Sequence, residues 1–540
     1  MSFGTTAICI YIIADFKLMS RAKLDKALLV KTITLMGLGN YDQGSGMSAA
    51  RFLIGRCRRL IITDLKNAKD LARQITEIKK LSVRAKSPHL RVGVGTKIIW
   101  HLGGHQKQDF IKTNLVVRNP DVPWYSPFLA LARRKGIPIY NDVTLFLLIT
   151  GRSRNLQPTS LQNLQPTTYN LQPTIGVTGT RGKSTTAALI YEMVKRENKQ
   201  ARLAGNIGQS PLNYVIASDP AKAGERGNPI TPGLLHSVRN DPWVLELSSF
   251  LLHDFAQIKY SPNIAVWTNF YPDHLNKYKG LKDYFVDKAN IFKYQQEGDA
   301  AIVNADDLAL RKIKTNKKIK VYFFSIKKAA NNGAFIKEGW FCFSAGGRLE
   351  KIAKVSETKL LGEHNQANIL AAIAAAKAAG VSSQNISAVI KKWGGLPNRL
   401  ELVREVGGVK WFNDCTATSP EAAIAALKSF PARKIILISG GNSKGSDLKE
   451  LGQTIGERVK ELILAPGDAN QDLLSKIQGA PLYTRVPLVF VSTIAAAVRR
   501  AALAAAKGDV VLLSPGLTWL PRQNEFARGQ EFIKLVEKIN

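Results

Sequence analysis

The stretch that most constrains this chain is Gly176 to Thr186, which reads GVTGTRGKSTT. A short β-prone run, Thr174 to Val177, precedes it, and apolar residues between 187 and 194 follow it at the spacing of an amphipathic helix. A strand, a glycine loop and a helix start can hold a polyphosphate, because backbone N–H groups and the helix N-terminus face the anion. The sequence therefore predicts a phosphate-binding loop in an α/β domain.

Side chains of this loop have the chemistry that is needed to bind a nucleoside triphosphate. Lys183 can reach the β- and γ-phosphates, and Ser184 or Thr185 can ligate Mg²⁺. The spacing differs from the standard P-loop, which has a glycine at the position of Val177. A strand-to-helix turn that happens to contain Gly-Lys-Ser is the alternative interpretation. The predicted nucleotide-binding residues are Gly179, Thr180, Arg181, Gly182, Lys183, Ser184 and Thr185.

Length and cysteine usage exclude several classes of protein. At 540 residues the chain is too long for one core, so we expect three or four domains. Its four cysteines lie far apart, which argues against a disulfide framework or a zinc site and for a reducing compartment. The apolar run Ala7 to Ala14 is too short to span a bilayer and no cleavage signal follows it. We expect a cytoplasmic monomer without membrane insertion.

The charge is unusual, because 76 Lys and Arg against 41 Asp and Glu give a net charge of +35. A basic surface is the usual footprint of nucleic-acid binding. The basic residues are spread over the whole length, however, and no helix-turn-helix or RNP-like signature accompanies them. We therefore expect a surface that attracts nucleotides and other anions without specific nucleic-acid binding.

The chain before the phosphate loop has the pattern of a Rossmann half. Lys31 to Met36 predicts a strand, Gly37-Leu-Gly39 a glycine loop, and residues 60–63 a second strand that ends on Asp64. In this pattern the acid accepts a hydrogen bond from a ribose hydroxyl. The glycine fingerprint is incomplete after Gly39, so a nucleotide other than a dinucleotide fits as well.

The remaining patterns divide the chain. Asn-Leu-Gln-Pro-Thr occurs three times between 155 and 174, which predicts a linker or insertion. Strand-like and helix-like segments alternate again near the C-terminus, which predicts a second doubly wound unit. We therefore expect an N-terminal extension (1–30), a Rossmann-like domain (31–150), a linker (151–174), a central P-loop-type ATPase domain (175–402) and a C-terminal Rossmann-like domain (403–540).

Three polar residues follow the phosphate loop at or just after predicted strands. Glu246 is a lone acid in the apolar strand Trp243 to Leu247, and in P-loop proteins such an acid binds Mg²⁺. A glutamate that reaches solvent at the strand end is the alternative. Asp273 and His274 follow the strand Ile264 to Asn269, at the edge where ligands bind in open α/β sheets. A helix start is the alternative for this pair.

Seven motifs in order resemble the Mur ligase family. They read GVTGTRGKST at 176–185, LELSSF at 245–250, TNFYPDH at 268–274, DKANIF at 287–292, GEHNQANILAA at 362–372, GLPNRLE at 395–401 and NDCTATSPEA at 413–422. The resemblance covers residues 31–540 and implies three α/β domains. It also implies ATP-dependent amide ligation through an acyl phosphate, which adds D-glutamate to UDP-N-acetylmuramoyl-L-alanine during peptidoglycan precursor synthesis. The alternatives are another Mur step, a folylpolyglutamate-type ligase, or a basic nucleic-acid-associated NTPase.

The resemblance further implies roles for single residues. Lys183, Glu246, His274 and Lys288 form the catalytic set. Ser184 and Glu246 would hold one Mg²⁺, and His274 would hold a second together with Lys288, which the family carbamylates. An ordinary helix-surface lysine is the alternative for Lys288. Asn365, Asn368, Arg399 and Asp414 would also bind ATP, Leu38, Gly39, Asp64, Asn119 and Asn206 would bind the UDP substrate, and Thr418, Lys444 and Ser514 the amino acid.

The chain departs from the family's pattern at three places. Arg181 stands where asparagine is common, and it adds a cation beside the phosphates. Thr416 stands where lysine is usual. The run after Ser514-Pro515 reads Gly516-Leu-Thr-Trp519 and is followed by a segment one residue shorter than in the family. The last two departures lie in the region that selects the amino acid.

Overall fold

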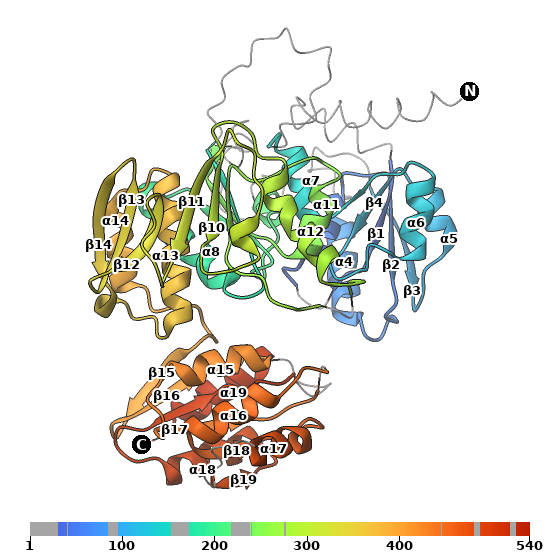
Figure 1. The fold of residues 1–540 in the computed structure, drawn as a ribbon. Helices are drawn as coiled ribbons and strands as arrows, with labels where there is room; N and C mark the ends of the chain where they lie inside the picture. The colour runs from blue at the N-terminus through green and yellow to red at the C-terminus, as the bar shows by residue number, and fades with distance from the viewer. Residues whose placement is uncertain are drawn as a thin grey trace, which may run out of the picture. The chain divides into compact units, whose positions relative to one another are not determined.

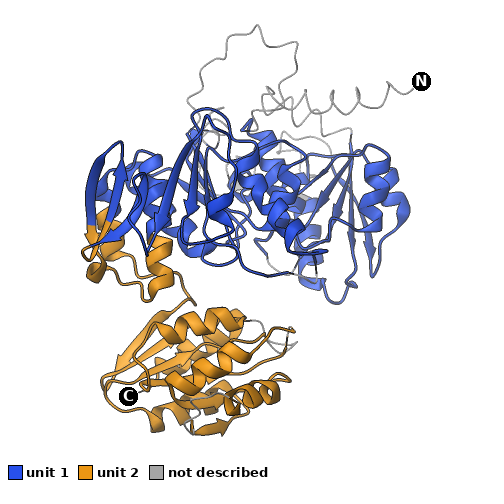
Figure 2. Ribbon diagram, in the orientation of Figure 1, with its two compact units in different colours: residues 1–337, 342–352, 370–386 blue, residues 338–341, 353–369, 387–540 orange. Residues whose placement is uncertain are grey.

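A computed structural model describes residues 31–39, 42–84, 95–152, 172–217, 238, 240–274, 277–443, 445–479, 486–518 and 525–539. Its strands form three sheets (Figure 1). The chain divides into two compact units (Figure 2): residues 1–337, 342–352 and 370–386 form unit 1, and residues 338–341, 353–369 and 387–540 form unit 2. The predicted extension and the repeats up to residue 171 lie outside the described residues.

The first sheet is parallel, with the strand order β3-β2-β1-β4-β5. Ile33 and Leu35 belong to one core cluster, whereas Met36 belongs to another on the opposite face, because successive side chains of a strand alternate. Helices α3, α4 and α7 contribute to the first cluster, and α5 and α6 to the second (Figure 1). The elements are β1 (Thr32–Met36), α3 (Ser45–Leu53), β2 (Arg59–Asp64), α4 (Ala72–Arg84), β3 (Lys97–Leu102), α5 (Lys107–Ile111), β4 (Leu115–Arg118), α6 (Pro127–Arg134), β5 (Ile139–Tyr140) and α7 (Asp142–Ile149).

The second sheet has the order β14-β13-β12-β11-β10-β9-β6-β8-β7. Strand β6 lies between β8 and β9 and is parallel to both, so the loop that follows β6 opens at their common carboxyl edge. The strands are β6 (Thr174–Thr178), β7 (Arg202–Gly205), β8 (Trp243–Glu246), β9 (Ile264–Trp267), β10 (Ala300–Asn304), β11 (Lys320–Ser325), β12 (Gly333–Lys337), β13 (Trp340–Ala345) and β14 (Arg348–Lys354). The helices are α8 (Lys183–Glu197), α9 (Leu212–Ala217), α11 (Ser249–Phe255), α12 (Leu281–Lys293), α13 (Glu363–Ala378) and α14 (Ser383–Lys392).

The first sheet and the phosphate-loop end of the second share one hydrophobic core within unit 1. Phe146 of α7 packs against Trp243 of β8, with ring centroids 4.5 Å apart. Arg118, the last residue of β4, forms an ion pair with Asp254 of α11 at 2.9 Å, and both side chains are buried. The edges that carry the predicted UDP site and phosphate site are therefore held together by protein contacts.

The third sheet, in unit 2, has the order β15-β16-β20-β17-β18-β19, and its strands are parallel except for the antiparallel pair β15 and β16. Leu437 faces the core formed with α15, α16 and α17, whereas Ile436 and Ile438 face α18 and α19. The elements are β15 (Glu401–Val406), β16 (Val409–Asn413), α15 (Pro420–Lys428), β17 (Ile435–Ser439), α16 (Lys449–Arg458), β18 (Val459–Leu464), α17 (Asn470–Gln478), β19 (Leu488–Phe490), α18 (Ile494–Ala504), β20 (Val510–Leu513) and α19 (Glu525–Val536).

The predicted fold class is confirmed, because along the chain a parallel sheet comes before, and a mainly parallel sheet after, the sheet that carries the phosphate loop, and each of the two is packed with helices. The predicted strands near residues 31–36, 60–64, 174–177, 243–247 and 264–269 are also confirmed. Each helix in the described part of the chain is too short or too polar to cross a membrane.

Candidate active site

The loop between β6 and α8 has the geometry of a phosphate-binding loop. Gly182 caps α8 with a φ of 78°, and Gly179 has a φ of 155°, a conformation that favours glycine. A Cβ atom on Gly179 would lie 1.9 Å from Thr268 Oγ1, so a larger residue would displace the loop. Lys183 Nζ donates to the carbonyl oxygens of Gly179 and Thr180 at 3.1 and 3.0 Å. Its ammonium group therefore lies against the loop backbone.

Residues 268 and 269, directly after β9, form hydrogen bonds with the phosphate loop. Thr268 Oγ1 donates to the Arg181 carbonyl oxygen at 2.7 Å, and the Arg181 N–H donates to Asn269 Oδ1 at 2.8 Å. The Arg181 guanidinium forms an ion pair with Asp273 at 2.9 Å. The cation by which this loop departs from the family's pattern is thus partly balanced by a neighbouring carboxylate.

Glu246 is buried at the end of β8, next to the strand that leads into the phosphate loop. It ends β8 opposite Val177 of β6, and it is 1% exposed, so it does not reach solvent. Its Oε1 accepts a hydrogen bond from Asn206 Nδ2 at 3.1 Å, whereas the buried Oε2 has no hydrogen-bond partner. A buried carboxylate oxygen without a donor is costly unless a cation stabilises it. Glu246 therefore fits a divalent cation.

A metal ion beside Glu246 could not be held by His, Cys, Asp and Glu side chains alone. The described residues contain no group of three or more His, Cys, Asp or Glu side chains that could hold a metal ion. A cation beside Glu246 would therefore take further oxygen ligands from the Ser184 hydroxyl and from phosphate. Ser184 follows Lys183 in the first turn of α8, at the same sheet edge as Glu246.

Lys288 on α12 is buried beside the phosphate loop, so the helix-surface alternative is wrong. Only 1% of the residue is exposed, and its Nζ donates to the Gly179 carbonyl oxygen at 2.7 Å. The ammonium also lies 4.8 Å from the centroid of the Tyr284 ring. Burial, together with the charge of Lys183, lowers the pKa of Lys288 well below its ordinary value. The neutral amine is therefore favoured more strongly here than in water.

His274 lies in the same region and has an exposed imidazole. Its ring centroid lies 5.0 Å from that of Phe250 and 6.0 Å from that of Tyr284, and its side chain is 43% exposed. Burial of part of the ring and the charge of Lys183 lower the pKa of His274 in spite of Asp273. The neutral imidazole, which is the form that ligates metals, is favoured.

Four residues predicted for the UDP substrate meet at the carboxyl edge of the first sheet. Asp64 Oδ2 accepts from the Leu38 N–H at 2.8 Å, so the acid fixes the glycine loop. A Cβ atom on Gly39 would lie 2.8 Å from Asn119 Nδ2. The fifth residue, Asn206, lies instead beside Glu246, to whose carbonyl oxygen its N–H donates at 2.9 Å.

Further residues predicted for ATP lie in unit 2. Asn365 and Asn368 share one face of α13, and Asn368 Nδ2 donates to Asn365 Oδ1 at 3.1 Å. Asp414 accepts from the Leu400 N–H at 3.1 Å and from Ser514 Oγ at 2.8 Å. Asp414, which is predicted to bind ATP, and Ser514, which is predicted to bind the amino acid, are therefore in direct contact. Arg399 precedes Leu400 and is exposed.

The loops predicted to select the amino acid lie close together in the same unit. Asn442 and Thr518 exchange backbone hydrogen bonds of 2.7 and 3.1 Å, which join the loop after β17 to the loop after β20. Thr418 follows β16, and its N–H donates to the Thr416 carbonyl oxygen at 2.9 Å. Lys444 lies outside the described residues, so its predicted role stays a prediction.

Burial of Asp414 predicts a pH-dependent stability. It raises the pKa of Asp414 to about 7 from an ordinary value of 3.8. Between these values the folded chain holds a proton that the unfolded chain releases, so stability falls as pH rises. We expect the urea midpoint of the C-terminal transition to decrease from pH 4 to pH 7, and Asp414→Asn to flatten this slope. The exposed Asp472→Asn variant should keep it, and an equal slope in both variants would contradict the assignment.

Sequence reasoning missed a group of residues at the junction of the first two sheets. Arg118 and Asp254 form the buried ion pair described above, and Asn141 Nδ2 donates to Asp254 Oδ2 at 2.8 Å. The signal for Arg118 was present, because it is a charged residue at the end of an apolar strand, as Glu246 is. Its partner, Asp254, lies 136 residues further along the chain, and no local sequence pattern indicates that the two residues pair.

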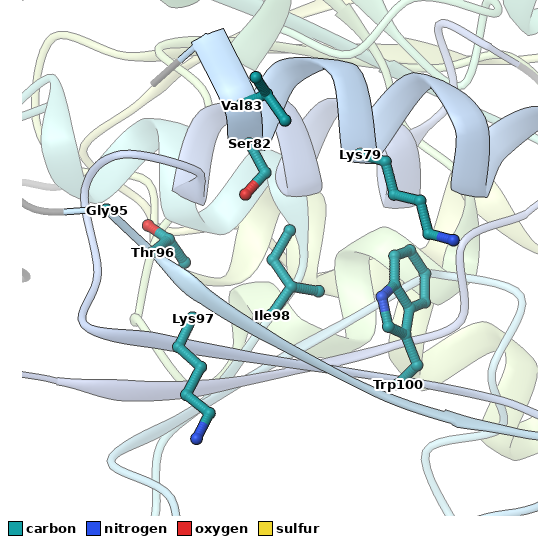
Figure 3. A pocket seen from close by; sticks show the side chains of 8 residues that line it. All are labelled: Lys79, Ser82, Val83, Gly95, Thr96, Lys97, Ile98 and Trp100. Atoms are coloured by element: carbon teal, nitrogen blue, oxygen red, sulfur yellow. The ribbon is translucent and has the colours of Figure 1, made fainter. Parts of the chain in front are cut away.

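A cavity of about 540 Å³ lies apart from these residues, between α4 and the edge strand β3 (Figure 3). Lys79 and Val83 line it from the helix, and Lys97, Ile98 and Trp100 from the strand. None of the predicted site residues lines this cavity, so it plays no part in the candidate active site.

Two family models match the chain. The Mur ligase middle domain matches residues 177–376, and the Mur ligase, glutamate ligase domain matches residues 398–517. Among solved structures, MurC from Thermotoga maritima covers 94% of this chain and 99% of its own, with 18% identity and a TM-score of 0.53. The match to MurF from the same organism, in complex with ADP, covers 94% of this chain and 97% of the MurF chain, with 16% identity and a TM-score of 0.50. These structures share the fold.

Curated relatives are similar over nearly the whole chain. Proteins named UDP-N-acetylmuramoylalanine–D-glutamate ligase from Acidobacterium capsulatum and a Roseiflexus species are 33% and 34% identical, and each match covers 94% of this chain. The matches cover 96% and 99% of those relatives. A protein of the same name from Thermoanaerobacter pseudethanolicus is 31% identical over 94% of this chain and 98% of its own length. The chain therefore belongs to the Mur ligase family of ATP-dependent ligases.

Proposed function

We propose that this chain adds D-glutamate to UDP-N-acetylmuramoyl-L-alanine at the expense of ATP, as a cytoplasmic monomer in peptidoglycan precursor synthesis. The observation that carries the proposal is that Lys183, Glu246 and Lys288 lie around one phosphate loop at the carboxyl edge of β6 and β8. Phosphoryl transfer requires such a set, because it depends on positioning and on charge neutralisation. The names of relatives 31–34% identical to this chain support the choice of substrates.

The proposed reaction has two steps. The substrate carboxylate attacks the γ-phosphorus of ATP and gives an acyl phosphate and ADP. The amine of D-glutamate then attacks the acyl carbon, and inorganic phosphate leaves as the amide bond forms. Lys183 stabilises the charge that develops on the transferred phosphoryl group, because its ammonium lies against the loop that faces the phosphates.

The metal sites belong to the proposal. Ser184 and Glu246 would hold one Mg²⁺, and His274 with carbamylated Lys288 would hold a second. Bound Mg²⁺ supplies positive charge that offsets the charge of the phosphates. The partnerless Glu246 Oε2 and the lowered pKa values of His274 and Lys288 support these assignments. Carbamylation would turn the cation at Lys288 into an anionic oxygen ligand.

Each domain has a proposed role. Residues 31–150 bind the UDP moiety, residues 175–402 bind ATP, and residues 403–540 bind the amino acid. The hydrogen bond between Leu38 and Asp64 and the close approach of Gly39 to Asn119 support the first role. Asn206 would meet the muramoyl end of the substrate beside Glu246. Asn365, Asn368, Arg399 and Asp414 would complete the ATP site, and Thr418, Lys444 and Ser514 would contact the amino acid.

Phosphate release measures the proposed reaction directly. We expect release to require ATP, UDP-N-acetylmuramoyl-L-alanine and an amino acid together, and D-glutamate to be preferred over L-glutamate and diaminopimelate by at least about tenfold, or about 1.4 kcal/mol. Equal rates with the three amino acids would contradict the proposed acceptor. Release stimulated by RNA or DNA without the UDP substrate would favour a nucleic-acid-associated NTPase.

Carbamylation predicts that activity depends on dissolved carbon dioxide. We expect the rate to fall when the enzyme is depleted of carbon dioxide and to recover when bicarbonate is added. Enzyme treated with ¹³C-bicarbonate should show a carbamate carbon in its NMR spectrum. Lys288→Arg should lack the signal, whereas Lys282→Ala, an exposed lysine of the same helix, should keep it. A wild-type enzyme with neither signal nor bicarbonate response would contradict the modification.

A further inference from the structure

The loop between β4 and α6 carries Asn119 and is attached to α11 at its first end. Arg118 is buried at the start of the loop, where its guanidinium pairs with Asp254 at 2.9 Å and donates to the Phe250 carbonyl oxygen at 2.8 Å. The same guanidinium donates to the carbonyl oxygen of Val122 at 2.8 Å, inside the loop. One buried side chain thus connects the loop backbone with α11.

Trp124 attaches the other end of this loop to the same helix. Its ring stacks on the imidazole of His253, with centroids 4.8 Å apart and planes 27° apart. Its centroid also lies 4.7 Å from that of Tyr278 and 6.0 Å from that of Phe250. A loop that is held at both ends on one helix has little freedom to move relative to that helix.

Helix α11 in turn contacts the phosphoryl-transfer residues. It begins at Ser249, three residues after Glu246, and the ring of its Phe250 lies 5.0 Å from that of His274. His253 Nδ1 lies 2.9 Å from Asp287 Oδ1, and Asp287 precedes Lys288 on α12. A continuous series of contacts therefore connects the Asn119 loop, through Trp124 and His253, with the helix that carries Lys288.

We propose that Trp124 and His253 are positioning residues that fix the distance between the nucleoside-diphosphate end of the substrate site, at the loop that carries Asn119, and its phosphoryl-transfer end. The inference rests on the proposed function, because it concerns a substrate in which a nucleoside diphosphate and a reacting carboxylate belong to one molecule. Such a substrate must reach both ends at once. A misplacement of about 1 Å between them reduces the rate by up to about 10²-fold, although each end still binds its own part.

The proposal predicts a separation between whole-substrate and partial-ligand binding. In Trp124→Ala we expect kcat/KM for UDP-N-acetylmuramoyl-L-alanine to fall by about 10- to 100-fold. The Kd values for UDP alone and for ATP should change by less than about twofold, since each of these ligands needs only one end of the site. Trp124→Phe should recover most of the activity, because it keeps an aromatic ring against His253. Phe490→Ala, which removes an exposed aromatic ring of β19 in unit 2, serves as the control.

His253 should act through the same contacts. His253→Ala is expected to lower kcat/KM for the UDP substrate. It should have little further effect in the Trp124→Ala background, because the two residues act through the same ring contact. Additive losses, or a loss of UDP affinity as large as the loss in kcat/KM, would overturn the positioning role. Wild-type enzyme without ligase activity would instead overturn the proposed function, and an active wild type with an equally active Trp124→Ala would overturn this inference alone.

Discussion

Replacing Lys183 with alanine is expected to lower ATP turnover by about 10²- to 10³-fold and to leave the fold intact. Lys183 Nζ lies against the Gly179 and Thr180 carbonyl oxygens, in the loop that would receive the γ-phosphate. The neighbouring cation of Arg181 is paired with Asp273 and cannot move to replace it without breaking that pair. Phosphate release under saturating substrates measures the loss, and circular dichroism shows whether the variant is folded.

The matched control for this variant lies on the same helix. Lys195 is in the last turn of α8, where it is exposed and contacts the Tyr191 ring, so Lys195→Ala should keep wild-type turnover. A Lys183→Ala enzyme with normal turnover would place the phosphate site elsewhere on the chain.

Replacing Arg118 with methionine is expected to lower the free energy of unfolding of the first two sheets by about 3–5 kcal/mol. The substitution leaves the Asp254 carboxylate buried, with Asn141 and Gln257 as donors but without its cation. Removing one partner of a buried ion pair costs more than the pair itself contributes, because the remaining charge stays desolvated. Urea unfolding, followed separately for each transition of this multidomain chain, gives the value.

A double variant distinguishes the loss of the pair from the loss of packing. Arg118→Met combined with Asp254→Leu should be more stable than Arg118→Met alone, because no unpaired charge remains. The exposed Arg134→Met variant should stay within about 0.5 kcal/mol of wild type. If the double variant is no more stable than the single one, the ion pair is not the reason for the loss.

Elements with a strong local pattern could be predicted from the sequence, and others could not. The strand, glycine loop and helix around Lys183 were predicted because each signal lies within about twenty residues. Helix α7 was missed, because all eight of its residues are buried and an all-round buried helix has no amphipathic period. Strand β3 was missed as well, since it is an edge strand whose residues are mostly half-buried and do not alternate.

The site shows the same division. Motifs singled out Glu246 and Lys288 as candidate site residues, and both side chains are buried in the structure, so neither is a surface residue. The contact of Asn206 with Glu246, and that of Trp124 with His253, join residues 40 and 129 positions apart, and neither partner indicates the other in the sequence. The first pairing depends on which strands become neighbours in the second sheet and the other on how the first two sheets pack, and no local pattern encodes either.

The hydrogen bonds between the phosphate loop and residues 268–269 affect the thermodynamics of nucleotide binding. Thr268 and Asn269 already fix the loop backbone at Arg181 through three hydrogen bonds. A nucleotide therefore meets a loop whose conformational entropy was lost when the chain folded, and little of the binding energy is spent on ordering it. Affinity then depends mainly on charge and desolvation, so nucleotide binding to this loop should weaken steeply with ionic strength.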